Sequence, residues 1–236
     1  MVNEITYFDT YGRADFIKLI AEIGEIPYTL RKLNFYNEWP LVKPSSRYGF
    51  VPFVKINEHW TLDQAIAIAR YFAQEGNAQL YPRDRFRATL SEEYIAAMED
   101  VYDEFSRIEF ATAEEFKEEE RVKFKNGILK RVATALNLEL EKHDGYLIPL
   151  LLNEKEIHEK KNLELDDEQQ LHSQQQQQRL TWADVYLFEL GNLLRYFMKV
   201  NIEEFIPQFT KLREHVWSNE KALAYLKSER NLRGEL

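Results

Sequence analysis

The stretch VPFVKINEHWTLDQAIAIARYFA, residues 51–73, decides the fold of the first part of the chain. Two short β-prone runs, 51–56 and 60–62, stand on either side of an Asn57-Glu58 turn and predict two strands. From Gln64 to Ala73 the apolar residues recur with a helical period, so a helix follows the second strand directly.

Toward the N-terminus the same kind of alternation continues. Residues 5–8 form a β-prone run, and the apolar stripe between Phe16 and Ile23 predicts a helix that ends near Gly24. Residues 27–30 read as another strand. The order β-α-β, then β-β-α, is typical of a small α+β domain with a mixed sheet.

Beyond Tyr81-Pro82 the pattern is helical. Residues 84–110 and 115–142 predict two long helices rich in Glu, Lys and Ala. A capping box formed by Thr181 and Asp184 marks the start of a third, and two shorter helices are expected around 203–215 and 218–229. We therefore expect two domains, residues 1–80 and 84–236.

The segment 153–179 interrupts the helical domain. It is highly charged at first and ends in an uninterrupted glutamine run, Gln174 to Gln178. Such a segment has too little apolar area to offset its ordering entropy, which predicts a disordered surface loop. A polyglutamine association site is the alternative.

Composition excludes several classes of function. A net charge of −9 repels phosphate backbones and anionic membranes, so we expect no nucleic acid or membrane partner. The absence of cysteine excludes disulfides and thiol nucleophiles. Five scattered histidines show no ligand spacing, so no metal is expected. With no secretory signal or membrane-length apolar run in sight, the expected location is cytoplasmic.

Several short motifs occur in a distinctive order. They are Tyr7-Phe8, Gly12-Arg13-Ala14-Asp15, Glu38-Trp39-Pro40 with Lys43, Val51-Pro52 (an X-Pro bond of the kind often cis in tight turns), residues 64–71, Glu99-Asp100 and residues 222–230. In this order and spacing they resemble the sigma-class glutathione transferases. That family includes the glutathione-dependent prostaglandin D synthases and the lens S-crystallins.

The resemblance implies a thioredoxin-like, glutathione-binding domain of order β-α-β-α-β-β-α at 1–80, followed by an all-helical domain. It also implies that Tyr7 donates a hydrogen bond to the glutathione sulfur, which stabilises the nucleophilic thiolate. Arg13 would favour negative charge beside it. A core tyrosine and an ordinary surface arginine are the structural alternatives.

The remaining implied site residues hold the tripeptide. Trp39 and Lys43 match contacts to its glycine end, and the backbone of Val51, before Pro52, would pair with the cysteinyl part. The start of the third helix, Gln64-Ala65, would receive the γ-glutamyl carboxylate. By the same resemblance, Asp100 of a partner subunit would meet the γ-glutamyl amine, which requires a homodimer; a plain helix-surface aspartate is the alternative.

For the second substrate, a small hydrophobic electrophile or a lipid peroxide, we expect an apolar pocket. Its candidate lining is Phe8, Tyr11, Tyr102 and Ser106, although aromatic residues at helical spacing also serve as core. Detoxification by conjugation, peroxide reduction and prostaglandin-type isomerisation all fit this chemistry.

Two positions depart from the family pattern. Ala65 replaces the usual serine and removes a hydroxyl that would bond the γ-glutamyl carboxylate. Asp63 brings a negative charge near the same carboxylate, and we expect it to cap the following helix. Both departures favour weaker glutathione binding. They keep open an alternative function, in which the chain is a ligand-binding or structural protein like the S-crystallins.

Overall fold

The computed structural model describes residues 2–57, 59–149 and 180–232. These residues divide into two compact units, 1–81 with 216–236 and 82–215. The chain passes from the first unit to the second between Tyr81 and Pro82, and returns to the first between His215 and Val216. The predicted loop at 153–179, with its glutamine run, lies outside the described residues.

The first unit contains a four-stranded mixed sheet. Its strands are β1 (Asn3–Phe8), β2 (Tyr28–Leu33), β3 (Phe53–Lys55) and β4 (Thr61–Asp63), in the spatial order β2-β1-β3-β4. β1 pairs in parallel with β2, while β3 is antiparallel to both β1 and β4. The connecting helices are α1 (Asp15–Ile23), α2 (Trp39–Val42) and α3 (Ala65–Glu75). This is the predicted order β-α-β-α-β-β-α.

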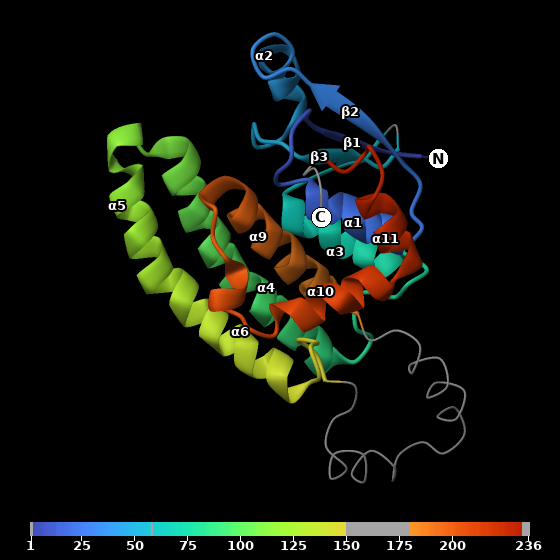
Figure 1. The fold of residues 1–236 in the computed structure, drawn as a ribbon. Helices are drawn as coiled ribbons and strands as arrows, with labels where there is room; N and C mark the ends of the chain where they lie inside the picture. The colour runs from blue at the N-terminus through green and yellow to red at the C-terminus, as the bar shows by residue number, and fades with distance from the viewer. Residues whose placement is uncertain (1, 58, 150–179, 233–236) are drawn as a thin grey trace, which may run out of the picture. The chain divides into compact units, whose positions relative to one another are not determined.

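Side chains along the strands point alternately to the two faces of the sheet, and apolar side chains are buried on both faces. Ile5 and Val54 are cross-strand partners, and both are fully buried. In Figure 1 α1 and α3 lie side by side along the sheet, and their buried side chains include Ile17, Ile20 and Phe72. Burying each such side chain contributes roughly 1.5–3 kcal/mol.

A smaller cluster is built from α2 and the ends of the strands. Leu33, Val42 and Phe53 are buried there, and Phe8, Trp39 and Val51 pack against them. The strand register brings two of these side chains together, because Phe8 of β1 is paired with Leu33 of β2. The helix that carries Trp39 is thereby packed against the C-terminal ends of β1 and β2.

The C-terminal helix α11 (Glu220–Leu226) belongs to the same unit and contacts α1. Asn219 caps it by accepting the Ala222 N–H at 3.0 Å. Beyond the helix, the Arg230 guanidinium pairs with the Glu22 carboxylate of α1. Short-range capping therefore starts this helix, and an ion pair distant in sequence fastens its end.

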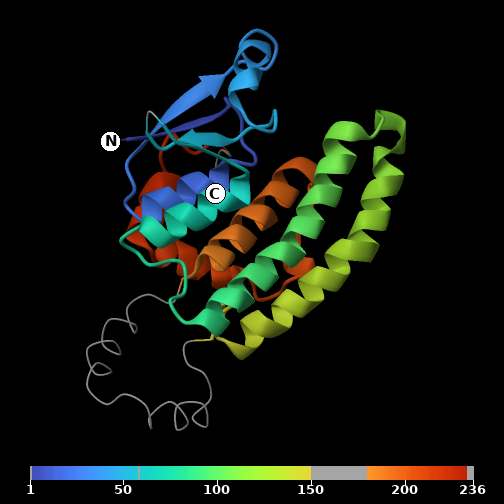
Figure 2. The same cartoon turned by 180° about the vertical axis from the view of Figure 1, so that it is seen from behind.

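In its described part the second unit contains helices joined by short connections, and no strands. Its helices are α4 (Arg85–Ser106), α5 (Glu114–Phe124), α6 (Lys130–Lys142), α9 (Trp182–Met198) and most of α10 (Phe209–Ser218). Figure 2 shows α9, α4 and the α5–α6 segment in that order across the unit. None of the helices in the described ranges is long and apolar enough to span a bilayer.

Two helix predictions need correction. The expected continuous helix 115–142 is two helices, separated by a π-helical turn in which Gly127 has φ −97° and ψ −107°. Glycine tolerates such a backbone, so the helical period alone did not reveal the break. The helix expected from residue 203 begins at Phe209 instead, after a 3-10 turn at Ile202–Glu204, because Pro207 disfavours helical backbone before it.

The predicted capping box at the start of α9 is confirmed. Thr181 N–H and Oγ–H both donate to Asp184 Oδ2, at 2.8 and 2.6 Å. Leu147 N–H donates to the other carboxylate oxygen at 2.7 Å. Burial raises the pKa of the fully buried Asp184 carboxyl, and these donors oppose the rise. One side chain thus fixes both the helix start and the segment before residue 150.

Candidate functional site

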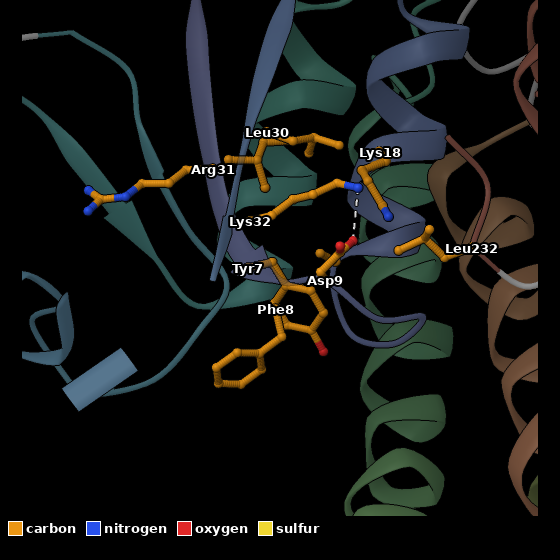
Figure 3. Close-up of a pocket in the computed structure, with 10 residues that line it drawn as sticks. Tyr7, Phe8, Asp9, Lys18, Leu30, Arg31, Lys32 and Leu232 are labelled. Carbon is orange, nitrogen blue, oxygen red and sulfur yellow. Dashed lines mark ion pairs between the residues drawn. The ribbon is translucent and has the colours of Figure 1, made fainter. Parts of the chain in front are cut away.

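Tyr7 lies near the end of β1, where its hydroxyl reaches the turn into α1. The Arg13 backbone N–H donates to Tyr7 Oη at 2.9 Å. A Cβ added to Gly12 would lie 2.7 Å from the same oxygen, so only glycine leaves room for it in this position. Figure 3 shows the rings of Tyr7 and Phe8 at this strand end. The Tyr7 side chain is half-buried.

The turn that carries Arg13 is fixed by a buried ion pair. Asp15 Oδ2 accepts the Gly12 N–H at 2.7 Å, and Gly12 C=O accepts the Asp15 N–H at 3.0 Å. Lys18 Nζ lies 2.6 Å from Asp15 Oδ1, with both side chains almost fully buried. A buried charge pair of this kind is sensitive to the loss of either partner. The Asp15–Lys18 pair therefore holds the backbone whose N–H points at Tyr7.

The sequence alone did not identify this role of Lys18. Its position among the apolar residues of α1 was the available signal, because a lysine inside such a stripe needs a buried partner. Arg13 is half-buried, with its guanidinium over the Phe16 ring at 5.9 Å. The contact described here between Arg13 and Tyr7 is made by the backbone. The predicted electrostatic role of the guanidinium stays a prediction.

Trp39 and Lys43 lie on α2 and the 3-10 turn that follows it. Trp39 is half-buried and meets the Phe8 ring edge-on, with centroids 5.8 Å apart. Lys43 is exposed, and its Cε lies 3.1 Å from the place where a Cβ on Gly49 would be. Both side chains are in the same unit as Tyr7, as their predicted role in binding glutathione requires.

The Val51–Pro52 peptide is cis, as the sequence suggested. Val51 is half-buried and stands directly before β3, and Pro52 is buried. The backbone role predicted for Val51 concerns a ligand contact and stays a prediction.

Gln64 is exposed and has φ +71°, a left-handed value that non-glycine residues seldom adopt. Residues held in such a conformation concentrate at binding and catalytic sites. The next residue, the buried Ala65, opens α3, and no side chain caps this helix start. The sequence showed the motif at 64–65 but not the backbone conformation.

The expectation that Asp63 caps α3 was wrong. Its Oδ1 instead accepts hydrogen bonds from Ser46 Oγ at 2.8 Å and from the Arg47 N–H at 3.0 Å. Both partners lie in the loop before β3, distant in sequence, and no periodicity or spacing pointed to them. Asp63 is buried at the end of β4.

The remaining candidates are distributed over both units. Tyr11, in the first unit, is only 2% exposed, whereas Phe8 is half-buried at the strand end. Asp100, Tyr102 and Ser106 lie on α4 of the second unit, where Asp100 is exposed and the other two are half-buried. Their contributions to an apolar pocket or to a partner's site stay predictions.

A small pocket lies on the side of Tyr7 toward α1 and β2. Figure 3 shows Lys18, Lys32 and Leu232 around it, with an ion pair from Lys32 to Asp9 at 2.9 Å. Within the described ranges, no group of three or more histidine or acidic side chains could hold a metal ion. The groups around Tyr7 include backbone N–H groups, the Asp9 and Asp15 carboxylates and the Lys18 and Lys32 ammonium groups.

Comparison with known proteins gives the class of this fold. A family model described as "Glutathione S-transferase, C-terminal domain" matches residues 172–229. A glutathione S-transferase of Anopheles gambiae is 20% identical over 94% of each chain. A class-mu 28 kDa glutathione S-transferase isozyme of Schistosoma japonicum is 25% identical over 97% of this chain and 98% of its own.

Solved structures agree with this class. Prostaglandin synthase D of Nilaparvata lugens matches with a TM-score of 0.76 and 17% identity, covering 97% of this chain and 98% of its own. A sigma-class glutathione transferase of Fasciola hepatica matches with a TM-score of 0.73 and 20% identity, over 96% and 95%. They confirm the predicted thioredoxin-like domain followed by an all-helical region.

The chain therefore has the glutathione transferase fold, and proteins named glutathione S-transferase are among its relatives. These findings agree with the resemblance to the sigma-class glutathione transferases that the motifs around Tyr7 and residues 51–71 carry.

Proposed function

We propose that the chain is a glutathione transferase in which the Tyr7 hydroxyl stabilises the thiolate of glutathione. The observation that carries the proposal is the 2.9 Å hydrogen bond from the Arg13 N–H to Tyr7 Oη. Accepting this bond uses a lone pair of the oxygen and not its proton. It also polarises the O–H group, which makes the phenol a better donor toward an anion.

The residues present fit the tripeptide. The start of α3 has no side-chain cap, and the N–H groups at such a helix end attract a carboxylate. Exposed Lys43 supplies a positive charge and half-buried Trp39 an indole donor for the glycine end. When bound, glutathione would supply the nucleophilic sulfur. The chain would supply the phenol, the backbone donors and the charges that orient it.

The proposed second substrate is a small hydrophobic electrophile or a lipid peroxide. Supporting this are Phe8, whose ring centroid lies 5.7 Å from that of Tyr7, and Trp39, which packs against Phe8. The proposal includes a homodimer, in which exposed Asp100 would meet the γ-glutamyl amine bound to the partner subunit. The names of the relatives, which include transferases and a prostaglandin synthase, favour this range of chemistry.

The test is Tyr7→Phe, measured by calorimetric titration with glutathione and by conjugation of a generic aromatic electrophile. Loss of one hydrogen bond to a charged sulfur corresponds to roughly 1.5–3 kcal/mol, or about tenfold to a hundredfold in turnover. Glutathione affinity should stay within about threefold, because the phenol is one contact among many. Tyr36→Phe, at an 82% exposed tyrosine, is the matched control and should change neither quantity.

Turnover by Tyr7→Phe within twofold of the unsubstituted protein would show that another group activates the thiol. If the unsubstituted protein binds glutathione without turnover, the alternative of a carrier or structural protein replaces the proposal. If it neither binds nor turns over glutathione at millimolar concentration, the proposed function is refuted.

A further inference from the structure

The loop between residues 46 and 50, called here the 46–50 loop, is closed on itself and fastened to β4. Phe50 N–H donates to Ser46 Oγ at 3.1 Å, and that oxygen also lies 2.8 Å from Phe50 C=O. Gly49 N–H donates to Ser46 C=O at 3.3 Å, with Gly49 in the left-handed region at φ +71°. Ser46 is therefore the residue around which the loop folds.

Asp63 fastens this loop from outside. Its Oδ1 takes the hydrogen bonds from Ser46 Oγ and the Arg47 N–H described above, across 17 and 16 residues of chain. Asp63 is 8% exposed and Ser46 is 6% exposed. A buried carboxylate without donors is strongly unfavourable, and bonds from donors to its charged form are among the stronger hydrogen bonds in proteins. The contact is thus a fixed attachment of the loop.

The attached loop lies between two groups that the proposed function uses. Lys43 precedes it, and the Lys43 aliphatic chain packs over Gly49. Val51 follows it, immediately before β3. Any displacement of the 46–50 loop would therefore move the Lys43 ammonium and the Val51 backbone together.

We infer that Asp63 is a positioning residue for glutathione binding, which holds Lys43 and Val51 in place through the 46–50 loop. This inference rests on the proposed function. It reverses the expectation from sequence that the charge of Asp63 weakens binding by repelling a carboxylate. Here the charge is directed at Ser46 and Arg47 and stabilises the loop that binds the tripeptide.

The test compares Asp63→Ala, Asp63→Asn and Ser46→Ala by calorimetric titration with glutathione. Asp63→Ala removes both attachments and should weaken binding about tenfold. Ser46→Ala leaves the Arg47 N–H bond to Asp63 and should weaken binding less. Asp63→Asn keeps an oxygen that can accept both bonds, so its affinity should lie within about threefold of the unsubstituted protein.

The kinetic readout separates positioning from general damage. For Asp63→Ala, KM for glutathione should rise about tenfold while kcat at saturating glutathione stays within twofold, because Tyr7 is not part of this loop. Tighter binding by both Asp63→Asn and Asp63→Ala would show that charge repulsion dominates, and would overturn the inference. A fall in kcat with unchanged KM would overturn it as well.

Amide hydrogen exchange tests the attachment without any ligand. In Asp63→Ala the Arg47 and Phe50 amides should exchange at least tenfold faster, whereas the amide of Ile5 in the paired strand β1 should not change. Unchanged exchange at Arg47 would refute the attachment itself. A third outcome is possible, in which Asp63→Ala exchanges faster but the unsubstituted protein binds no glutathione. That result would refute the proposed function and the binding role that rests on it, and would leave the attachment of the loop to Asp63 established.

Discussion

The substitution Gly12→Ala tests the geometry around Tyr7 most directly. The added Cβ would lie 2.7 Å from Tyr7 Oη, whereas ordinary contacts begin at 3.4 Å, so the two atoms must separate by about 0.7 Å. Gly12 has no positive φ, which means that alanine is compatible with the backbone there. Any effect of the substitution therefore comes from the contact with the hydroxyl.

The magnitude follows from two losses. Overfilling a packed site costs about 1–3 kcal/mol of unfolding free energy. Moving the phenol also lengthens the 2.9 Å bond from Arg13 N–H toward the limit of hydrogen bonding, which costs about 1 kcal/mol more. Replacing glycine by alanine also raises the unfolding free energy by about 0.4–1 kcal/mol, because alanine lowers the conformational entropy of the unfolded chain. The expected net loss of stability is about 2 kcal/mol.

The matched control is the same substitution in a Tyr7→Phe background. Without the hydroxyl, the nearest ring carbon is 3.6 Å from the added Cβ, an ordinary contact. There Gly12→Ala should be neutral or stabilise the protein by up to about 1 kcal/mol. The double-mutant cycle should thus give a coupling energy of about 2–3 kcal/mol between the two positions.

Urea unfolding of the four proteins measures this coupling, and the conjugation assay provides a second readout. Gly12→Ala should lower turnover toward the level of Tyr7→Phe, since both remove the phenol oxygen from its place. A coupling energy below about 0.5 kcal/mol would show that the Tyr7 hydroxyl does not lie over Gly12. The geometric basis of the proposed function would then be lost.

Three further predictions concern single side chains. Asp184→Ala leaves three hydrogen-bond donors without their acceptor and should lower the unfolding free energy by about 3–5 kcal/mol. Thr181→Ala should lower it by only about 1 kcal/mol. Equal losses in urea unfolding would contradict the shared capping role of Asp184. Burial and the charge of Glu139 raise the pKa of Tyr94 to about 12. Because the unfolded chain releases this proton near pH 10, stability should be full below that pH and fall as pH rises through 12. The decline should be shallower in Tyr94→Phe, and parallel unfolding curves would exclude this assignment. Ala65→Ser should tighten glutathione binding about tenfold in calorimetry, and an unchanged affinity would show that a hydroxyl at 65 does not reach the γ-glutamyl carboxylate.

Local sequence signals determined the elements of this protein. The runs at residues 5–8, 51–56 and 60–62 predicted strands, because alternating or β-branched residues suit a pleated, half-buried surface. Thr181 and Asp184 marked the start of α9, because a capping box is complete within four residues of chain. Signals of this range do not depend on the rest of the fold, so they can be read without it.

Local signals failed where one residue changes a long pattern. The helix predicted over 115–142 is interrupted at Gly127, and the helix predicted from 203 is delayed by Pro207. Glycine and proline have backbone preferences that differ from those of the other amino acids, and the spacing of apolar residues does not reveal the effect of either one. The motifs at Tyr7, Arg13 and residues 64–65 indicated a site, and the resemblance supplied their roles.

Only the tertiary structure decided which groups those motifs meet. Tyr7 Oη accepts a hydrogen bond from a backbone N–H, and every residue except proline has such a group, so the sequence does not indicate which one. The Asp15–Lys18 pair holds that backbone, and its burial is known only from the structure. The sequence predicts Asp63 to be a helix cap, whereas in the structure it attaches a loop, because its hydrogen-bond donors lie 16 and 17 residues away along the chain. The physical reason is general. Local periodicity fixes where strands and helices form, whereas the energy of a buried polar group depends on partners that only folding brings within hydrogen-bond distance.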